Sequence, residues 1–173
     1  MEEQKLFNKG TEESSKFYAI FENFLFVLLI VIGYIGMSPI KYKGIPYISI
    51  IFAIFVIIML VFVLRKHLCT KCYYYDKCCH CGWGKLSSLL FKKDTGNQEL
   101  GGKLAGLTWG VLMGLPILVM IIIVLIKKAT LIEELIFFIP FLILVMINGF
   151  LHKIDCDKCK MRFICPGSAS KKE

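Results

Sequence analysis

Two cysteine-rich segments hold the residues best suited to chemistry in this sequence. The first has the spacing C-x2-C-x5-C-x2-C through Cys69, Cys72, Cys78 and Cys81. A C-x2-C pair in a tight turn aims two thiolates at one metal, and a second pair five residues later can close a four-thiolate site. His80 lies inside this run and is the best histidine candidate for a ligand. The segment therefore predicts bound metal.

The second segment has the spacing C-x2-C-x5-C, through Cys156, Cys159 and Cys165. Ser168 stands where the first segment has its fourth cysteine, so this site lacks one thiol of its own. Cys79 is the candidate to supply it, because eight thiols then divide into two sets of four. Bacterial-type ferredoxins likewise let one cysteine of a run serve the other cluster. We treat this cross-ligation as a hypothesis.

Both segments resemble the auxiliary [4Fe–4S] motif of SPASM and twitch domains. The second segment matches the motif in residue types, over Lys-Met-Arg-Phe-Ile-Cys-Pro-Gly, and the first matches it in the number of cysteine ligands. The match covers 13 residues or fewer in each copy. The resemblance implies one cluster on the four spaced thiols of the first segment, and three ligands of a second on Cys156, Cys159 and Cys165. It does not extend to the radical chemistry of those enzymes, whose C-x3-C-x2-C motif this chain lacks.

Other uses of the same thiols stay open at this stage. Zinc is the alternative cofactor, since four sulfurs at these spacings do not choose between zinc and iron. Exchangeable disulfides, as in thiol oxidases of the DsbB and vitamin K epoxide reductase type, are a further alternative. Thiols that only pack or carry soft metal ions are another. No nucleophile–base pair, phosphate loop or pair of catalytic carboxylates is recognisable, so no catalytic residue is predicted.

The two segments belong to an internal repeat. Cys156 lies 87 residues after Cys69, and this offset also aligns identical pairs on either side: Leu64 with Leu151, Lys66 with Lys153, Lys71 with Lys158, Cys72 with Cys159, and Cys78 with Cys165. We therefore divide the chain into a mobile arm (1–15), repeat 1 (16–85), an interfacial helix with a linker (86–102) and repeat 2 (103–173).

The rest of each repeat is apolar. The chain is 57% hydrophobic, more than a soluble domain of 173 residues can bury. Four uncharged runs are long enough to cross the roughly 30 Å hydrocarbon core as helices: Phe24–Ile40, Pro46–Leu64, Leu104–Ile126 and Leu135–Leu151. We predict an all-α integral membrane protein with four transmembrane helices, arranged as two parallel hairpins that each lead into a cysteine segment.

The basic residues predict the orientation of the helices. Seventeen of the 21 Lys and Arg residues lie in the segments on the side of the cysteines, against four in the two opposite loops. Both termini and all cysteines are then expected on the cytoplasmic side. The membrane is expected to be the cell membrane of a prokaryote. The net charge of +8 fits anionic headgroups rather than nucleic acid, because the charge follows membrane-adjacent stretches.

One helix face and several polar residues carry weaker expectations. Gly102, Gly106, Gly110 and Gly114 recur every four residues, which allows close helix approach. We favour a contact within the chain over a homodimer. His67 and His152 are expected at headgroup level, as is Glu22.

Together these features predict a membrane-anchored metal protein. The leading expectation is an iron–sulfur electron-transfer module with one or two [4Fe–4S] clusters, bound to the bilayer and to a redox or docking protein. The alternatives are a zinc-stabilised membrane scaffold and, less favoured, a thiol-redox enzyme.

Overall fold

Helices make up about two thirds of the described chain, which comprises residues 6–126 and 129–170 of the computed structural model. In order they are α1 (Lys16–Met37), α2 (Tyr47–Ile58), the π-helical turn η1 (Met59–Val63), α3 (Leu64–His67), the 3-10 turn η2 (Cys69–Lys71), α4 (Trp83–Leu90), α5 (Gln98–Leu125) and α6 (Leu131–Asp157). The described residues contain no β-strand.

Four of the helical stretches are long and apolar enough to cross a membrane, which confirms the predicted fold class. They are Lys16–Met37, Tyr47–Lys71, Gln98–Leu125 and Leu131–Asp157. The second is composite, because η1 inserts a π-turn between α2 and α3. A π-turn adds one residue to a helical turn and so changes which side chains face the neighbouring helices.

Local sequence explains where the last two long helices begin. The Asn97 side chain accepts a hydrogen bond from the Leu100 backbone N–H at the start of α5. At the start of α6, Thr130 and Glu133 form a reciprocal capping box. Each cap satisfies backbone donors that the first helical turn leaves without a partner.

The bundle is apolar both inside and outside. Leu29, Phe52 and Phe141 are fully buried between the helices. Large apolar side chains such as Phe17 and Ile132 are exposed on the outer surface. A soluble protein would have a polar outer surface there, so this distribution suits a surface covered by lipid.

Close helix approach occurs at glycines other than the predicted ones. A Cβ added at Gly33 of α1 would lie 3.0 Å from Phe141 and 3.3 Å from Pro116, so α1 packs tightly on α5 and α6 there. In contrast, a Cβ at Gly106, Gly110 or Gly114 would meet nothing within 4 Å. The favoured intramolecular contact is therefore wrong for these three positions, because α5 turns this face away from its neighbours. Gly102 does contact the chain, through Pro166.

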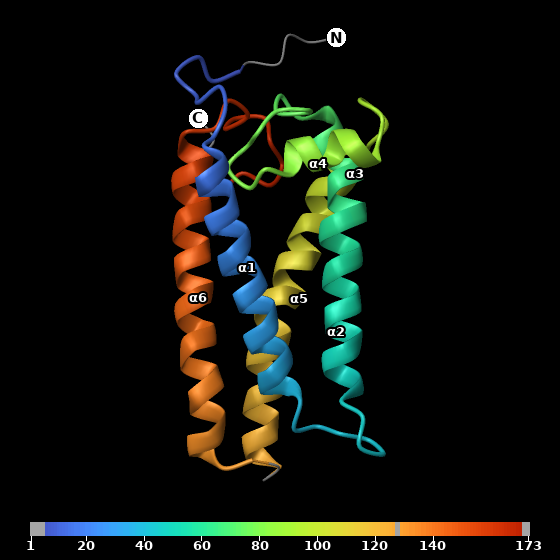
Figure 1. The fold of residues 1–173 in the computed structure, drawn as a ribbon, viewed down its shortest axis with the longest axis vertical. Coiled ribbons are helices and arrows are strands. Elements are labelled where there is room, and N and C mark those ends of the chain that lie inside the picture. The colour runs from blue at the N-terminus through green and yellow to red at the C-terminus, as the bar shows by residue number, and fades with distance from the viewer. Residues whose placement is uncertain (1–5, 127–128, 171–173) are drawn as a thin grey trace.

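Both cysteine segments lie at one end of the bundle, which we call the cysteine end (Figure 1). Helix α4 lies across this end, and the two short interhelical loops lie at the opposite end. The predicted interfacial segment of 86–102 thus contains the second half of α4 and the start of α5. The repeat relationship, the domain boundaries and the side of the membrane stay predictions.

Candidate metal centre

The two C-x2-C pairs adopt the same backbone turn. The Cys72 N–H donates to the Cys69 carbonyl at 3.2 Å, and the Cys159 N–H donates to the Cys156 carbonyl at 3.2 Å. The first turn follows the second span through η2, whereas the second turn continues the last turn of α6. Both pairs are thus held at the end of a long helix, where neighbouring helices fix their position.

Tyr74 joins the two segments. Its buried hydroxyl donates to the Thr11 carbonyl at 2.5 Å and accepts from the Lys160 backbone N–H at 3.1 Å. The predicted arm takes part in this junction: the Thr11 N–H donates to the Lys158 carbonyl at 2.8 Å, and the Ser14 N–H donates to the Cys78 carbonyl at 2.8 Å. Residues 6–15 therefore bridge the cysteine segments, while residues 1–5 lie outside the described part of the chain.

A cavity of about 160 Å³ lies where the segments meet. Seven of the eight cysteines line it: Cys69, Cys72, Cys79, Cys81, Cys156, Cys159 and Cys165. Phe26, Trp83 and Trp109 supply apolar walls from three different helices. The fold thus gathers thiols that are far apart in the sequence around one largely apolar space.

Cys78 does not line this cavity, although the sequence motif includes it. Its thiol contacts the carbonyl of Cys79 at 3.7 Å. The neighbouring Cys79 lines the cavity instead, and its sulfur accepts a hydrogen bond from the Trp83 N–H at 3.2 Å, at the first turn of α4. Adjacent residues point in different directions here, so spacing alone could not choose between them.

The Cys72 thiol has cysteine neighbours in both segments. Cys72 interacts with Cys69 of its own segment and with both Cys159 and Cys165 of the other. We call Cys69, Cys72, Cys159 and Cys165 the shared thiol set. The predicted grouping assigned these residues to two separate sites, one per segment, whereas the observed neighbourhood crosses the segments.

Burial favours the protonated form of two thiols outside the spans, Cys72 and Cys159, by raising the pKa of each. It raises the pKa of Cys72 well above its usual value, and the nearby thiols of Cys69 and Cys165 add to the shift. Burial also raises the pKa of Cys159 to about 11. A bound cation reverses this balance, because a coordinating thiol is deprotonated by the metal's charge.

Arg65 places a buried positive charge beside the thiols. The residue is 5% exposed, and its Nε and Nη1 atoms are buried without a hydrogen-bond partner. Its guanidinium stacks over the Trp83 ring at 4.0 Å and interacts electrostatically with Cys69, Cys79 and Cys81. A buried charge with unsatisfied donors is costly unless an anion compensates it.

A second group of ligand atoms also lines this cavity. Glu22 of α1 meets His80 and Cys81 of the first cysteine segment, with their ligand atoms all within 4.8 Å of one another. The Cys81 thiol donates to Glu22 Oε2 at 3.3 Å. Burial lowers the pKa of His80, which favours the neutral imidazole that binds metals.

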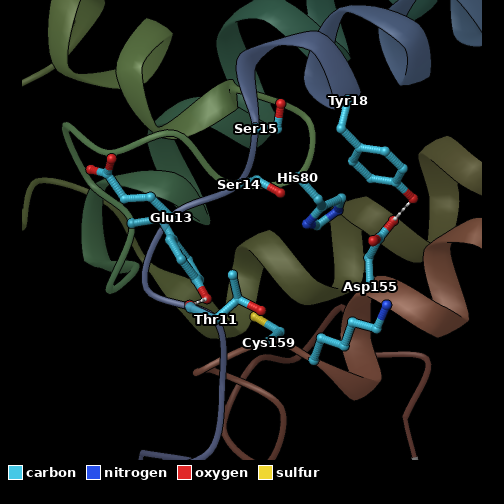
Figure 2. A pocket seen from close by; sticks show the side chains of 10 residues that line it. Thr11, Glu13, Ser14, Ser15, Tyr18, His80, Asp155 and Cys159 are labelled. Atoms are coloured by element: carbon cyan, nitrogen blue, oxygen red, sulfur yellow. Dashed lines mark hydrogen bonds between the residues drawn. The ribbon is translucent and has the colours of Figure 1, made fainter.

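A second, more open cavity of about 360 Å³ reaches this group from the surface. Figure 2 shows His80 projecting into it, with Tyr18 and Asp155 meeting on one side. The Tyr18 hydroxyl donates to Asp155 Oδ2 at 3.2 Å. His80 lines both cavities and so lies between the surface and the cysteines.

Sequence reasoning missed several residues of this region. Glu22 and His152 were expected at headgroup level, yet Glu22 is 5% exposed and His152 contacts the Cys156 sulfur at 3.7 Å. Arg65 and Asp155 were given no role. Glu22 was the one sequence feature that could have indicated this site. It is an acidic residue beside an otherwise apolar run, and ionisable residues in membrane spans usually have a function.

Comparison with models of protein families, with characterised proteins and with solved structures finds no match to this chain. Its function is therefore inferred from the residues of the site.

Proposed function

We propose that this chain is a membrane-anchored iron–sulfur protein, with a [4Fe–4S] cluster held by the shared thiol set. The observation that carries the proposal is the single cavity lined by seven cysteines from two segments. Four thiolates are the usual ligands of such a cluster. Cys69, Cys72, Cys159 and Cys165 supply them, and the long helices hold both segments in register.

The charge around the cavity supports an anionic cofactor. A cluster bound by four thiolates is negatively charged, and Arg65 offers buried donors that otherwise lack a partner. Arg162 also lines the cavity, and its Nε is buried without a partner. Two guanidinium groups beside the thiols lower the cost of placing that negative charge in an apolar space.

The spacing of the thiols is compatible with the proposed cluster. Four sulfurs on one zinc at 2.3 Å would lie about 3.8 Å apart. Among the described residues, Glu22, His80 and Cys81 form the group whose ligand atoms all lie within 4.8 Å, so the shared thiol set is more widely spaced. In a cubane cluster each thiolate binds a different iron, which suits that wider spacing.

Electron relay is the function that such a centre would serve here. A bound cluster supplies reversible one-electron chemistry. It would accept one electron at a time from a reduced, acidic carrier protein and pass each to a quinone in the bilayer. Two such transfers, with two protons taken up from water, would give the quinol. Exposed lysines at the cysteine end would dock the acidic donor, including Lys66, Lys71 and Lys85.

The test is the metal content of the whole chain, purified without air in detergent. The proposal expects about four irons and four sulfides per chain, and a brown colour that fades on reduction. Colourless protein that contains zinc in place of iron would contradict the electron-relay proposal and would support the alternative of a zinc-stabilised scaffold.

A matched pair of variants connects the metal to the cavity. Cys72→Ala removes a thiol of the shared set, and Cys78→Ala removes one that lies outside the cavity. We expect the first to lose the iron and the second to keep it. Equal loss in both would contradict the proposed ligands.

A further inference from the structure

We propose that Glu22, His80 and Cys81 form a second metal site, distinct from the shared thiol set, for one divalent ion of the zinc class. The site joins a transmembrane helix to the first cysteine segment. Its three ligand atoms lie within 4.8 Å of one another, as donors to a single ion must. It goes beyond the proposed cluster, because neither its ligands nor its metal are those of the relay.

The donor atoms match zinc in type and separation. Zinc accepts carboxylate oxygen, imidazole nitrogen and thiolate sulfur together. At ordinary bond lengths, a tetrahedral ion holds its sulfur and oxygen ligands about 3.6 Å apart. The Cys81 sulfur and Glu22 Oε2 lie 3.3 Å apart, so a small displacement suffices.

Charge also favours a divalent ion. Glu22 is 5% exposed, and a carboxylate at that depth needs a compensating charge or a proton. One carboxylate and one thiolate carry two negative charges, which a divalent ion neutralises, while the imidazole stays neutral. Without the ion, the Cys81 thiol hydrogen-bonds Glu22, so that a shared proton stands where the cation would bind.

Surrounding residues hold the ligands in place. Asp155 lies beside the Glu22 carboxyl and accepts a hydrogen bond from the Tyr18 hydroxyl. The His80 ring lies 6.1 Å from the ring of His152. Carboxylates and hydroxyls that orient ligands in this way are usual around zinc.

The open cavity provides a route for the ion and for a fourth ligand. His80 and Asp155 both line the cavity of about 360 Å³ that opens to the surface (Figure 2). Three protein ligands with one position open to water are typical of reactive rather than structural zinc sites. The ion would therefore keep an exchangeable water on the side of this cavity.

The experiment uses the whole chain in detergent, purified without air and washed with a mild chelator. Zinc is added by equilibrium dialysis, and bound zinc and iron are both measured by elemental analysis. X-ray absorption spectroscopy at the zinc edge identifies the atoms that coordinate the zinc. We expect one tightly held zinc per chain with one sulfur neighbour and otherwise nitrogen or oxygen. Four sulfur neighbours, or no retained zinc, would overturn the proposal.

Variants test the named ligands. Glu22→Gln and His80→Gln should each weaken zinc binding at least tenfold while iron per chain stays constant. Glu99→Gln, in an exposed ion pair, and His67→Gln are the matched controls and should bind as the parent does. Unchanged affinity in Glu22→Gln and His80→Gln would overturn the assignment. Parent protein that holds the zinc with one sulfur neighbour but contains no iron would count against the relay alone, so the two proposals fail separately.

Discussion

The Tyr74 hydroxyl accepts a hydrogen bond at 3.1 Å from the backbone N–H of Lys160, a residue 86 positions later in the chain. The same hydroxyl donates to Thr11, so one phenol connects the arm and both cysteine segments. Because the shared thiol set draws on both segments, this junction should decide whether its four sulfurs stay together.

Replacing Tyr74 tests that role. Tyr74→Phe leaves the Thr11 carbonyl and the Lys160 N–H without this partner, which should cost about 1–3 kcal/mol of unfolding free energy. Thermal unfolding in detergent measures it, alongside iron per chain. Tyr73→Phe is the control, since its hydroxyl bonds to Glu12 at the surface. Equal stability of the two variants would show that the junction is not structural.

Much of the fold could be predicted from local sequence, but the composition of the site could not. Uninterrupted apolar runs identify the spans because hydrocarbon thickness sets their length. The partner of Cys72 in the other segment depends on how helices pack, and the different directions of Cys78 and Cys79 depend on the turn before α4. Glu22 joins His80 and Cys81 only after α1 packs beside the first segment, a long-range contact that no spacing reveals.

Arg65 should tune the redox potential of the proposed cluster. Removing its positive charge with Arg65→Met favours the more oxidised, less negative cluster and should lower the potential by on the order of 60 mV, a tenfold change for one electron. Redox titration followed by visible absorption measures the shift. Lys66→Met, which removes an exposed charge one residue away, should change the potential far less. A potential that rises in Arg65→Met would refute this role.

The metal-free protein should lose stability at high pH. Burial raises the pKa of Cys159 from 9.0 to about 11, so the folded chain holds this proton more tightly than the unfolded chain. The resulting stability is fully present below pH 9.0 and is lost as the pH rises through about 11, by on the order of 3 kcal/mol.

Thermal unfolding of reduced, metal-free protein across that range measures this loss. Cys159→Ser should show a smaller decrease, and the difference between the two proteins isolates the thiol. A wild-type stability that stays level or increases with pH would contradict the assignment.

Gly33 should be far less tolerant of a side chain than Gly110. Gly33→Leu forces α1 away from Phe141 and Pro116, and overpacking of this kind costs about 1–3 kcal/mol. Gly110→Leu meets open space within the chain. The unfolding free energies of the two variants are compared in detergent. Size-exclusion chromatography tests whether Gly110→Leu disrupts a homodimer. Equal destabilisation in monomeric protein would contradict the observed packing.

The central claim is that thiols from both segments hold one centre, and iron analysis of two single variants tests it most directly. Cys72→Ala and Cys159→Ala are purified without air beside the parent chain, and iron and sulfide are counted in each. The account predicts that either substitution removes the same set of about four irons. Loss of a different half of the iron in each variant would mean two independent sites, one per segment, and would contradict it.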